Sequence, residues 1–314
     1  MKKIALIFPG YGSQYVGMGK DLYDEYRTMQ ELFEEAYSCQ NLNFVKLCFA
    51  SSDQDLAEIV NAFQSIFLLC CALFNLLKEL GVNPDVVTGQ GIGYFASLFA
   101  GGSITLPDGL YLLNKLATFY EKILDNENLG MIEVSEISRI ELEKIVEKFA
   151  DDNKLAIAVF KSKNDFLVGG YKEQLNKLED FLEKIEGVEI SEAPTEVGLY
   201  SDLMEEAAKQ LQVYLEKVDF KDVETPVIVA GRTGFLTTGQ EIKDDLIESL
   251  TRPFDWDQVL DELKEYDVII EVGPRSKLSD VVKKYYPEKI VLTFGNKADV
   301  ERIKKLFGAE QNSE

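Results

Sequence analysis

One short stretch constrains the fold of this chain more than any other. The segment Val86-Val87-Thr88-Gly89-Gln90-Gly91-Ile92-Gly93-Tyr94-Phe95 begins with β-branched residues and leads into an apolar run with helical spacing. Strand, tight turn and helix in succession is the geometry of a nucleophile elbow, which is written Gly-x-Ser-x-Gly. The outer glycines, Gly89 and Gly93, are both present, and they allow a sharp turn with the helix packed close to the strand.

The central position of this turn is Gly91, which has no side chain and cannot attack a substrate. A nucleophile at an elbow is held in a strained backbone conformation that costs roughly 1–3 kcal/mol, whereas glycine adopts it almost freely. Gly91 therefore preserves the turn but supplies no nucleophile for the reaction. Taken alone, the three glycines are best interpreted as a strand-to-helix turn. A phosphate-binding turn is a weaker interpretation, because the spacing is not that of dinucleotide sites and no P-loop lysine follows.

Histidine is absent from all 314 residues of the chain. Imidazole is the usual general base of acyl-transfer sites and the commonest nitrogen ligand of metals. Its absence excludes Ser-His, Cys-His and His-metal chemistry, and we expect no cofactor and no metal site.

The formal net charge of −22 argues against binding to nucleic acid or to an anionic membrane surface. No apolar run is expected to span a bilayer, because Asn75, Lys78 and Glu79 interrupt the most apolar stretch, Ile66 to Leu80, which we interpret as a buried helix. The apolar run at the N-terminus is too short for a signal peptide and is interpreted as a first strand. Four cysteines without a CxxC motif fit a reducing cytoplasm.

The order of predicted elements indicates an α/β fold with two parts. Strands alternate with helices over 1–127 and 197–314, which predicts one large, discontinuous domain with a mostly parallel sheet covered on both faces. Over 128–196 the order becomes β-α-β-β-α-β, which predicts an inserted small domain of ferredoxin-like type. A single long helix is predicted from about Asp55 to Leu80, and another from Leu106 to about Leu124.

Several segments, in order along nearly the whole chain, resemble the malonyl-CoA:acyl carrier protein transacylases and the acyltransferase domains of polyketide synthases. Phe8-Pro9-Gly10-Tyr11-Gly12-Ser13-Gln14 is similar to the family's Phe-Pro-Gly-Gln-Gly-Ser-Gln, and 89–93 stands where the family has Gly-His-Ser-Leu-Gly. Thr225-Pro226-Val227, Arg252-Pro253-Phe254-Asp255-Trp256 and Glu271-Val272-Gly273-Pro274 are similar to later family segments. The resemblance implies a large α/β-hydrolase-like domain with the ferredoxin-like insertion.

The same resemblance implies that the catalytic positions have lost their chemistry. Gly91 replaces the family's serine and Gln90 the histidine before it, and Tyr200 falls where the family has its activating histidine. Leu116 falls where the family has the arginine that pairs with the malonyl carboxylate, and Tyr11 replaces the glutamine near the oxyanion hole. Bulky replacements either fill the space of the acyl chain or reflect drift after catalysis was lost, and the two explanations have equal weight.

Three functions follow as hypotheses. The first is a non-catalytic homologue in fatty-acid or polyketide biosynthesis that binds an acyl carrier protein, a polyketide synthase module or a sister acyltransferase. The second is an acyltransferase or acyl-thioester hydrolase with changed catalytic residues, for which the candidates are Ser13, Ser97, Asp202 and Arg232.

The third hypothesis is binding of CoA or of the carrier protein's arm without turnover. The negative net charge opposes it, because CoA is anionic and carrier proteins are typically acidic. A local basic patch could support it, with Arg275, Lys277, Lys283 and Lys284 as candidates, although a solvated helix face explains the same residues.

Overall fold

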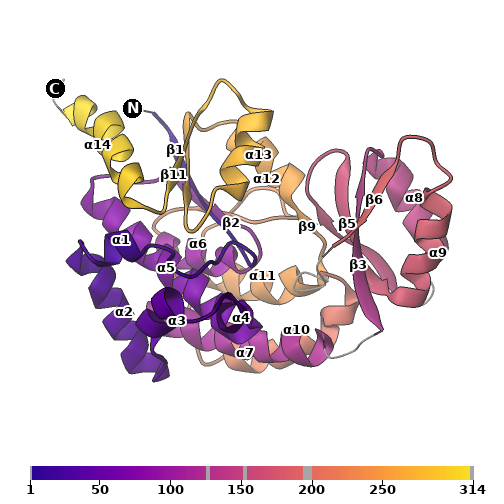
Figure 1. Cartoon of the computed structure of the whole chain (residues 1–314), viewed down its shortest axis with the longest axis horizontal. Helices are drawn as coiled ribbons and strands as arrows, with labels where there is room; N and C mark the ends of the chain where they lie inside the picture. The colour runs from indigo at the N-terminus through magenta and orange to yellow at the C-terminus, as the bar shows by residue number, and fades with distance from the viewer. Residues whose placement is uncertain (1, 125–127, 151–153, 194–199, 312–314) are drawn as a thin grey trace.

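The computed structural model describes residues 2–124, 128–150, 154–193 and 200–311. Its strands form two sheets, one of six strands in the order β11-β10-β1-β2-β7-β8 and one of five in the order β6-β3-β5-β4-β9 (Figure 1). The strands of the six-stranded sheet are β1 (Ile4–Phe8), β2 (Val86–Gly89), β7 (Val227–Ile228), β8 (Phe235–Leu236), β10 (Val268–Val272) and β11 (Ile290–Phe294). The strands of the five-stranded sheet are β3 (Leu129–Ser135), β4 (Leu155–Phe160), β5 (Asp165–Tyr171), β6 (Glu189–Glu192) and β9 (Phe254–Asp255).

The six-stranded sheet is parallel except for its last pair, β7 and β8, and helices cover both of its faces. Along β1, Leu6 and Phe8 point into the larger core, whereas Ala5 and Ile7 point into a second core on the opposite face. The larger core is built from α5 (Ile59–Glu79), α6 (Gly93–Gly101), α7 (Leu106–Leu124), α10 (Glu205–Leu215) and α11 (Gly239–Thr251), and the second from α12 (Trp256–Leu263) and α13 (Lys277–Tyr285). Burial on both faces explains why these strands are almost wholly apolar.

The remaining helices of this part lie around the six-stranded sheet (Figure 1). They are α1 (Lys20–Tyr23), α2 (Arg27–Gln40), α3 (Phe44–Ala50), α4 (Asp53–Ala57), a 3₁₀ turn (Asp202–Met204) and α14 (Lys297–Gln311). By length and composition α5 could cross a membrane, contrary to the expectation from the sequence, but 78% of its most apolar window is buried inside the protein. It is the buried core helix that its sequence indicates.

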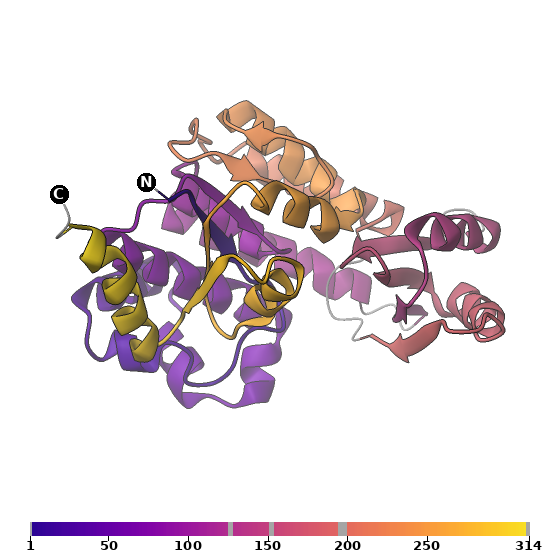
Figure 2. The same ribbon diagram turned by 90° about the horizontal axis from the view of Figure 1, so that it is seen from above.

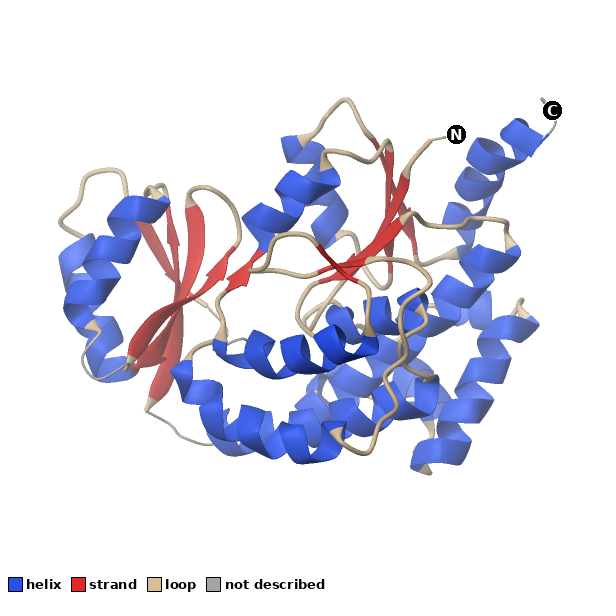
Figure 3. Ribbon diagram, turned by 180° about the vertical axis from the view of Figure 1, so that it is seen from behind, coloured by secondary structure: helices blue, strands red, loops and turns tan. Residues whose placement is uncertain are grey.

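The five-stranded sheet contains the predicted β-α-β-β-α-β unit, set to one side of the larger sheet (Figure 2). Its helices, α8 (Arg139–Phe149) and α9 (Lys172–Leu182), contribute Leu142, Ile145 and Leu178 to a separate core with Val134 and Phe166 of the strands. The two groups of strands, each with its own helices, are also distinct from behind (Figure 3). The fold class predicted from the sequence is confirmed, whereas the predicted domain boundaries fall at or beside 125–127 and 194–199, outside the described residues.

One strand joins the two parts in a way that the sequence did not predict. β9 follows α11 in the large part, yet it pairs in parallel with β4, with Phe254 opposite Val159 and Asp255 opposite Phe160. Arg139 of α8 reinforces this junction by an ion pair to Asp255 at 2.6 Å. The small sheet is therefore completed by a strand from the large part.

The predictions for single helices and strands had different outcomes. The helix predicted from Leu106 to Leu124 is confirmed. The helix predicted from Asp55 to Leu80 is two helices, α4 and α5, because the backbone of Glu58 is not helical (φ −53°, ψ 131°). The short helix α3 and strand β8 were not predicted.

Candidate functional site

The predicted elbow lies at the carboxyl end of β2, which is where open α/β sheets place their ligands. Gln90 N donates to Phe8 O at 2.9 Å, and Tyr94 N donates to Gly91 O at 3.0 Å, so the chain turns directly from β2 into α6. A Cβ atom at Gly89 would lie 2.1 Å from the Gly93 carbonyl. The outer glycine is therefore required by the close approach of strand and helix.

Gly91 has a φ of +55°, which is the left-handed conformation of a nucleophile at an elbow. A Cβ atom built there would lie 3.0 Å from the hydroxyl oxygen of Tyr200. Tyr200, with φ +25°, packs its ring against Phe254 with the ring centroids 5.5 Å apart. Burial raises the pKa of the Tyr200 phenol above its ordinary value, so the group facing the empty position is a neutral hydroxyl.

Two small cavities, of about 30 Å³ each, border Gly91. One is lined mainly by Tyr94, Tyr200 and Phe254, and the other by apolar side chains that include Leu116 and Tyr120. A volume of this size holds about one water molecule. Each of these two cavities is too small for an acyl chain.

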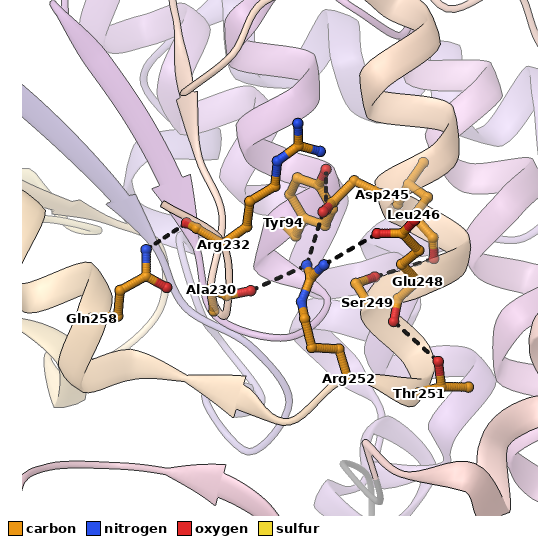
Figure 4. A network of polar contacts seen from close by, with 10 residues as sticks. All are labelled: Tyr94, Ala230, Arg232, Asp245, Leu246, Glu248, Ser249, Thr251, Arg252 and Gln258. Carbon is orange, nitrogen blue, oxygen red and sulfur yellow. Dashed lines mark hydrogen bonds and ion pairs between the residues drawn. The ribbon is translucent and has the colours of Figure 1, made fainter. Parts of the chain in front are cut away.

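A buried polar network lies beside these cavities (Figure 4). The Tyr94 hydroxyl donates to Asp245 Oδ2 at 3.0 Å, and Arg252 Nη2 donates to Asp245 Oδ1 at 2.8 Å and to the Ala230 carbonyl at 3.2 Å. Burial and the neighbouring Asp245 raise the pKa of the Tyr94 phenol well above its ordinary value. The network ties α6, α11 and the loop after β7 together, which makes it a structural element.

The sequence analysis missed Asp245 and the role of Arg252. A signal was present, because Asp245 lies on the same face of α11 as the buried residues Ile242 and Leu246. An acidic residue within an apolar helix face indicates a buried partner. The partner itself, Tyr94, is 151 residues away and could not be identified from spacing.

The structure brings three of the five predicted site residues together: Gly91, Leu116 and Tyr200 all line one cavity. Tyr11 and Gln90 line neither cavity. The Tyr11 hydroxyl instead donates to the Ala57 carbonyl at 2.8 Å, and its ring lies edge-on to Phe63. Tyr11 therefore belongs to the wall between the first loop and α4–α5.

The serines considered as alternative nucleophiles are engaged by main-chain carbonyls. Ser13 Oγ donates to Gly10 O and Ser97 Oγ donates to Tyr94 O, each at 2.7 Å. Neither hydroxyl bonds to a carboxylate or a lysine among the residues that the structure describes. Asp202 is exposed at the start of the 3₁₀ turn. These contacts supply neither of the serines with a general base.

Two of the four basic residues considered for an anionic ligand are engaged by other groups. Arg275 donates to the main-chain oxygens of Ser13 at 3.2 Å and Gln14 at 3.5 Å, and Lys283 lies 3.8 Å from Asp280. Within the described ranges, no three His, Cys, Asp or Glu side chains gather to hold a metal ion. Lys277 and Lys284 make no hydrogen bond or ion pair with another described residue, and neither does the guanidinium of Arg232, which was considered for a changed catalytic site.

Comparison with known proteins agrees with the fold. Residues 5–306 match the family model described as acyl transferase domain. A malonyl CoA-acyl carrier protein transacylase of Bacillus subtilis strain 168 is 29% identical over 289 residues, which is 90% of each chain. The corresponding enzyme of Escherichia coli K12 is 24% identical over 287 residues, covering 90% of this chain and 93% of that one.

Solved structures show the same architecture. A malonyl CoA-acyl carrier protein transacylase of Clostridium perfringens superposes with a TM-score of 0.93 at 24% identity, covering 99% of both chains. A malonyl-transacylase solved in complex with a type II polyketide synthase acyl-carrier protein gives a TM-score of 0.90 at 19% identity, covering 96% of this chain and 98% of that one. Since the family model spans almost the entire sequence, the chain belongs to the acyl transferase domain family.

Proposed function

We propose that this protein is a non-catalytic acyl transferase homologue that acts by binding a partner in fatty-acid or polyketide biosynthesis. One observation carries the proposal. The position of the seryl side chain is empty at Gly91, and the neutral hydroxyl of Tyr200 lies 3.0 Å from where its Cβ would be. The fold around this position is intact, so the loss is confined to the chemistry.

Acyl transfer through a covalent intermediate needs a nucleophile and a base that accepts its proton. In a comparable hydrolase, removing either of these groups lowers turnover by about 10⁶, and the oxyanion hole with substrate binding leaves about 10³–10⁴ over water. This chain has no histidine, and the hydroxyls of Ser13 and Ser97 bond to main-chain carbonyls. A residual rate of that size does not support a transferase.

The dimensions of the site support the same proposal. Leu116 is 3% exposed and stands where the family resemblance places the arginine for the malonyl carboxylate. Without that guanidinium a carboxylated acyl group loses its bidentate partner. The two cavities of about 30 Å³ indicate that the replacements fill the former acyl space. Of the two explanations for the bulky residues, filling of the pocket is the one that the packing favours.

The family suggests three kinds of partner: an acyl carrier protein, a polyketide synthase module, or a sister acyltransferase. The relatives are named for transfer to acyl carrier protein, and one related structure is a complex with such a carrier. The net charge of −22 ranks an acidic carrier below the other two, because like charges slow association and weaken binding. A sister acyltransferase or a synthase module is therefore the favoured partner.

The test is transfer of malonyl from malonyl-CoA to a purified acyl carrier protein, assayed beside the Bacillus subtilis transacylase. We expect no transfer above the rate without enzyme, and no release of free malonate, which would report a thioester hydrolase. Turnover of either kind that survives repurification would contradict the proposal. For the partner, size-exclusion chromatography with a sister acyltransferase should show a common peak that the carrier protein alone does not give.

A further inference from the structure

A hollow lined largely by aromatic side chains lies on the side of the molecule away from the small sheet. It is formed by the short helices α1 and α3 and by one face of α2, which lie together in Figure 1. Its volume is about 700 Å³, which is in the range of sites for small molecules. No residue of the two elbow cavities lines this hollow, which we call the aromatic groove.

Three rings in mutual contact line the aromatic groove. Between ring centroids, Tyr23 of α1 lies 5.2 Å from Phe33 of α2 and 5.1 Å from Phe49 of α3. Phe33 and Phe49 are stacked, with their centroids 5.5 Å apart. Phe33 is buried, whereas Tyr23 and Phe49 are only half-buried, so two of the three rings still present surface to a further ring.

Helical spacing brings further apolar side chains to the walls of the groove. Residues 33, 34, 37 and 38 form one face of α2, and residues 45, 46, 49 and 50 form one face of α3. On these faces Tyr37 is 52% exposed and Val45 is 37% exposed. Single exposed apolar side chains need no explanation, but several that gather around one hollow mark an interaction site.

The charges that line the groove cancel one another. They are Lys20, Asp24, Glu34 and Lys46. Lys20 Nζ lies 2.5 Å from Asp24, and Glu34 accepts two hydrogen bonds of 2.8 Å from Arg27. Lys46 is exposed, so solvent screens its charge. In a chain of net charge −22, this balanced lining favours an uncharged ligand.

Unused hydrogen-bonding groups stand among the apolar ones. The hydroxyls of Tyr23 and Tyr37 and the side-chain N–H groups of Asn43 make no hydrogen bond with a described residue. The Asn43 side-chain oxygen, in contrast, accepts from Lys46 N at 2.9 Å and caps α3, which fixes the orientation of the amide. An apolar and aromatic lining with a few polar groups is the usual composition of a small-molecule site.

We propose that the aromatic groove binds an uncharged aromatic molecule that carries a hydroxyl or carbonyl group. The rings of such a ligand make edge-to-face or offset contacts with Tyr23 and Phe49, and its oxygen bonds to the phenol and amide groups of the lining. The site does not depend on whether the elbow is catalytic, because the two regions share no lining residue.

The test is titration of the full chain with naphthol, followed by calorimetry and by the amide resonances of Tyr37 and Val45. Naphthoate tests the effect of charge, and decahydronaphthol tests the need for an aromatic ring. We expect saturable binding of naphthol that shifts both resonances, with each analogue bound about fivefold more weakly. No saturable binding up to about 1 mM naphthol, or equal binding of either analogue, would overturn the proposal.

Two variants separate the groove from the rest of the surface. Tyr37→Ala removes an exposed wall and should weaken naphthol about fivefold. Phe49→Leu keeps an apolar side chain but removes a ring, so it should reduce the preference for naphthol over decahydronaphthol.

The matched control is Phe181→Ala, which removes a ring of α9 that is 37% exposed and lies outside the groove. It should bind naphthol as the unmodified protein does, and thermal unfolding should confirm that all variants are folded. Equal losses in Tyr37→Ala and Phe181→Ala would contradict the assignment. So would a dimer in sedimentation that Tyr37→Ala dissociates, because the groove would then be occupied by a second copy of the chain.

Discussion

Gly91 and Tyr200 line the same small cavity, and the side chain at each position limits the size of the side chain at the other. The left-handed backbone at Gly91 is accessible to glycine without strain, and the Tyr200 hydroxyl occupies the space beside it. A serine at position 91 would recreate the strained conformation of a nucleophile but would find a phenol where a base is needed. The two residues therefore have to change together for the chemistry to return.

The first prediction concerns Gly91→Ser. The left-handed conformation and the 3.0 Å contact with Tyr200 should lower the free energy of unfolding by about 1–2 kcal/mol. Urea denaturation measures this change. Tyr200→Phe in the same background removes the hydroxyl and should recover part of the loss. A serine variant as stable as the parent would show that the site has space that the structure does not contain. Neither variant should transfer malonyl groups.

At the scale of elements, the Glu-Val-Gly-Pro segment joins a strand to a helix through a buried carboxylate. Glu271, at the end of β10, accepts N–H bonds from Leu278 at 3.3 Å and Ser279 at 2.7 Å in the first turn of α13. The position suits a negative charge because helix N-termini are positive. Burial nevertheless raises the pKa of Glu271, against the opposing effect of these hydrogen bonds.

The second prediction follows from this raised pKa. The folded state holds the proton of Glu271 more tightly than the unfolded state does, so its contribution to stability is full below the unfolded pKa and falls as pH rises through the folded pKa. Glu271→Gln cannot ionise. Its stability relative to the parent should therefore improve steadily as pH rises from about 4.3. Urea titrations between pH 4 and 7 measure this difference, with the exposed Glu265→Gln as control. A difference that does not depend on pH would contradict the assignment.

At the scale of the whole molecule, β9 and Arg139 hold the small sheet against the large part. The pairing of β9 with β4 and the Arg139–Asp255 ion pair fix the wall of the elbow cavities, because Phe254 of β9 packs on Tyr200. The contact between the two sheets therefore also positions Phe254, which packs on Tyr200 beside Gly91.

The third prediction is that Arg139→Ala loosens this junction. Loss of the partly exposed ion pair and of the contact with Phe160 should lower stability by about 1 kcal/mol, and hydrogen exchange along β4 should accelerate. Arg27→Ala removes only exposed pairs with Glu31 and Glu34 and serves as the control. Equal effects of the two substitutions on β4 would show that Arg139 does not hold the sheets together.

Much of this architecture follows from local sequence. The elbow was predicted because β-branched residues, closely spaced glycines and an apolar helix follow one another within ten residues. The strand β9 was not, because two residues carry no periodicity and its partner β4 lies about a hundred residues earlier. The break at Glu58 was missed since the apolar pattern continues through it, although Ser52 begins α4 with a capping box.

In the candidate site, too, some features can be predicted from local sequence and others depend on contacts between distant segments. The absent nucleophile and the absent histidine can be seen directly in the sequence. The approach of Tyr200 to Gly91 and the hydrogen bond from Tyr94 to Asp245 depend on how distant segments pack. Tyr11 was expected near the oxyanion hole from the resemblance, but its hydroxyl bonds to Ala57. Sequence patterns identify which groups are present, whereas contacts across the fold decide where they point.

The central proposal is that this protein forms no covalent acyl intermediate during catalysis, because Gly91 stands where the family resemblance places the serine. Mass spectrometry of the intact protein after incubation with malonyl-CoA or acetyl-CoA tests it most directly, with the Bacillus subtilis transacylase treated in parallel. We predict that the protein keeps its unmodified mass while the relative gains an acyl group. A stoichiometric malonyl or acetyl adduct that maps to one residue of this protein would contradict the account.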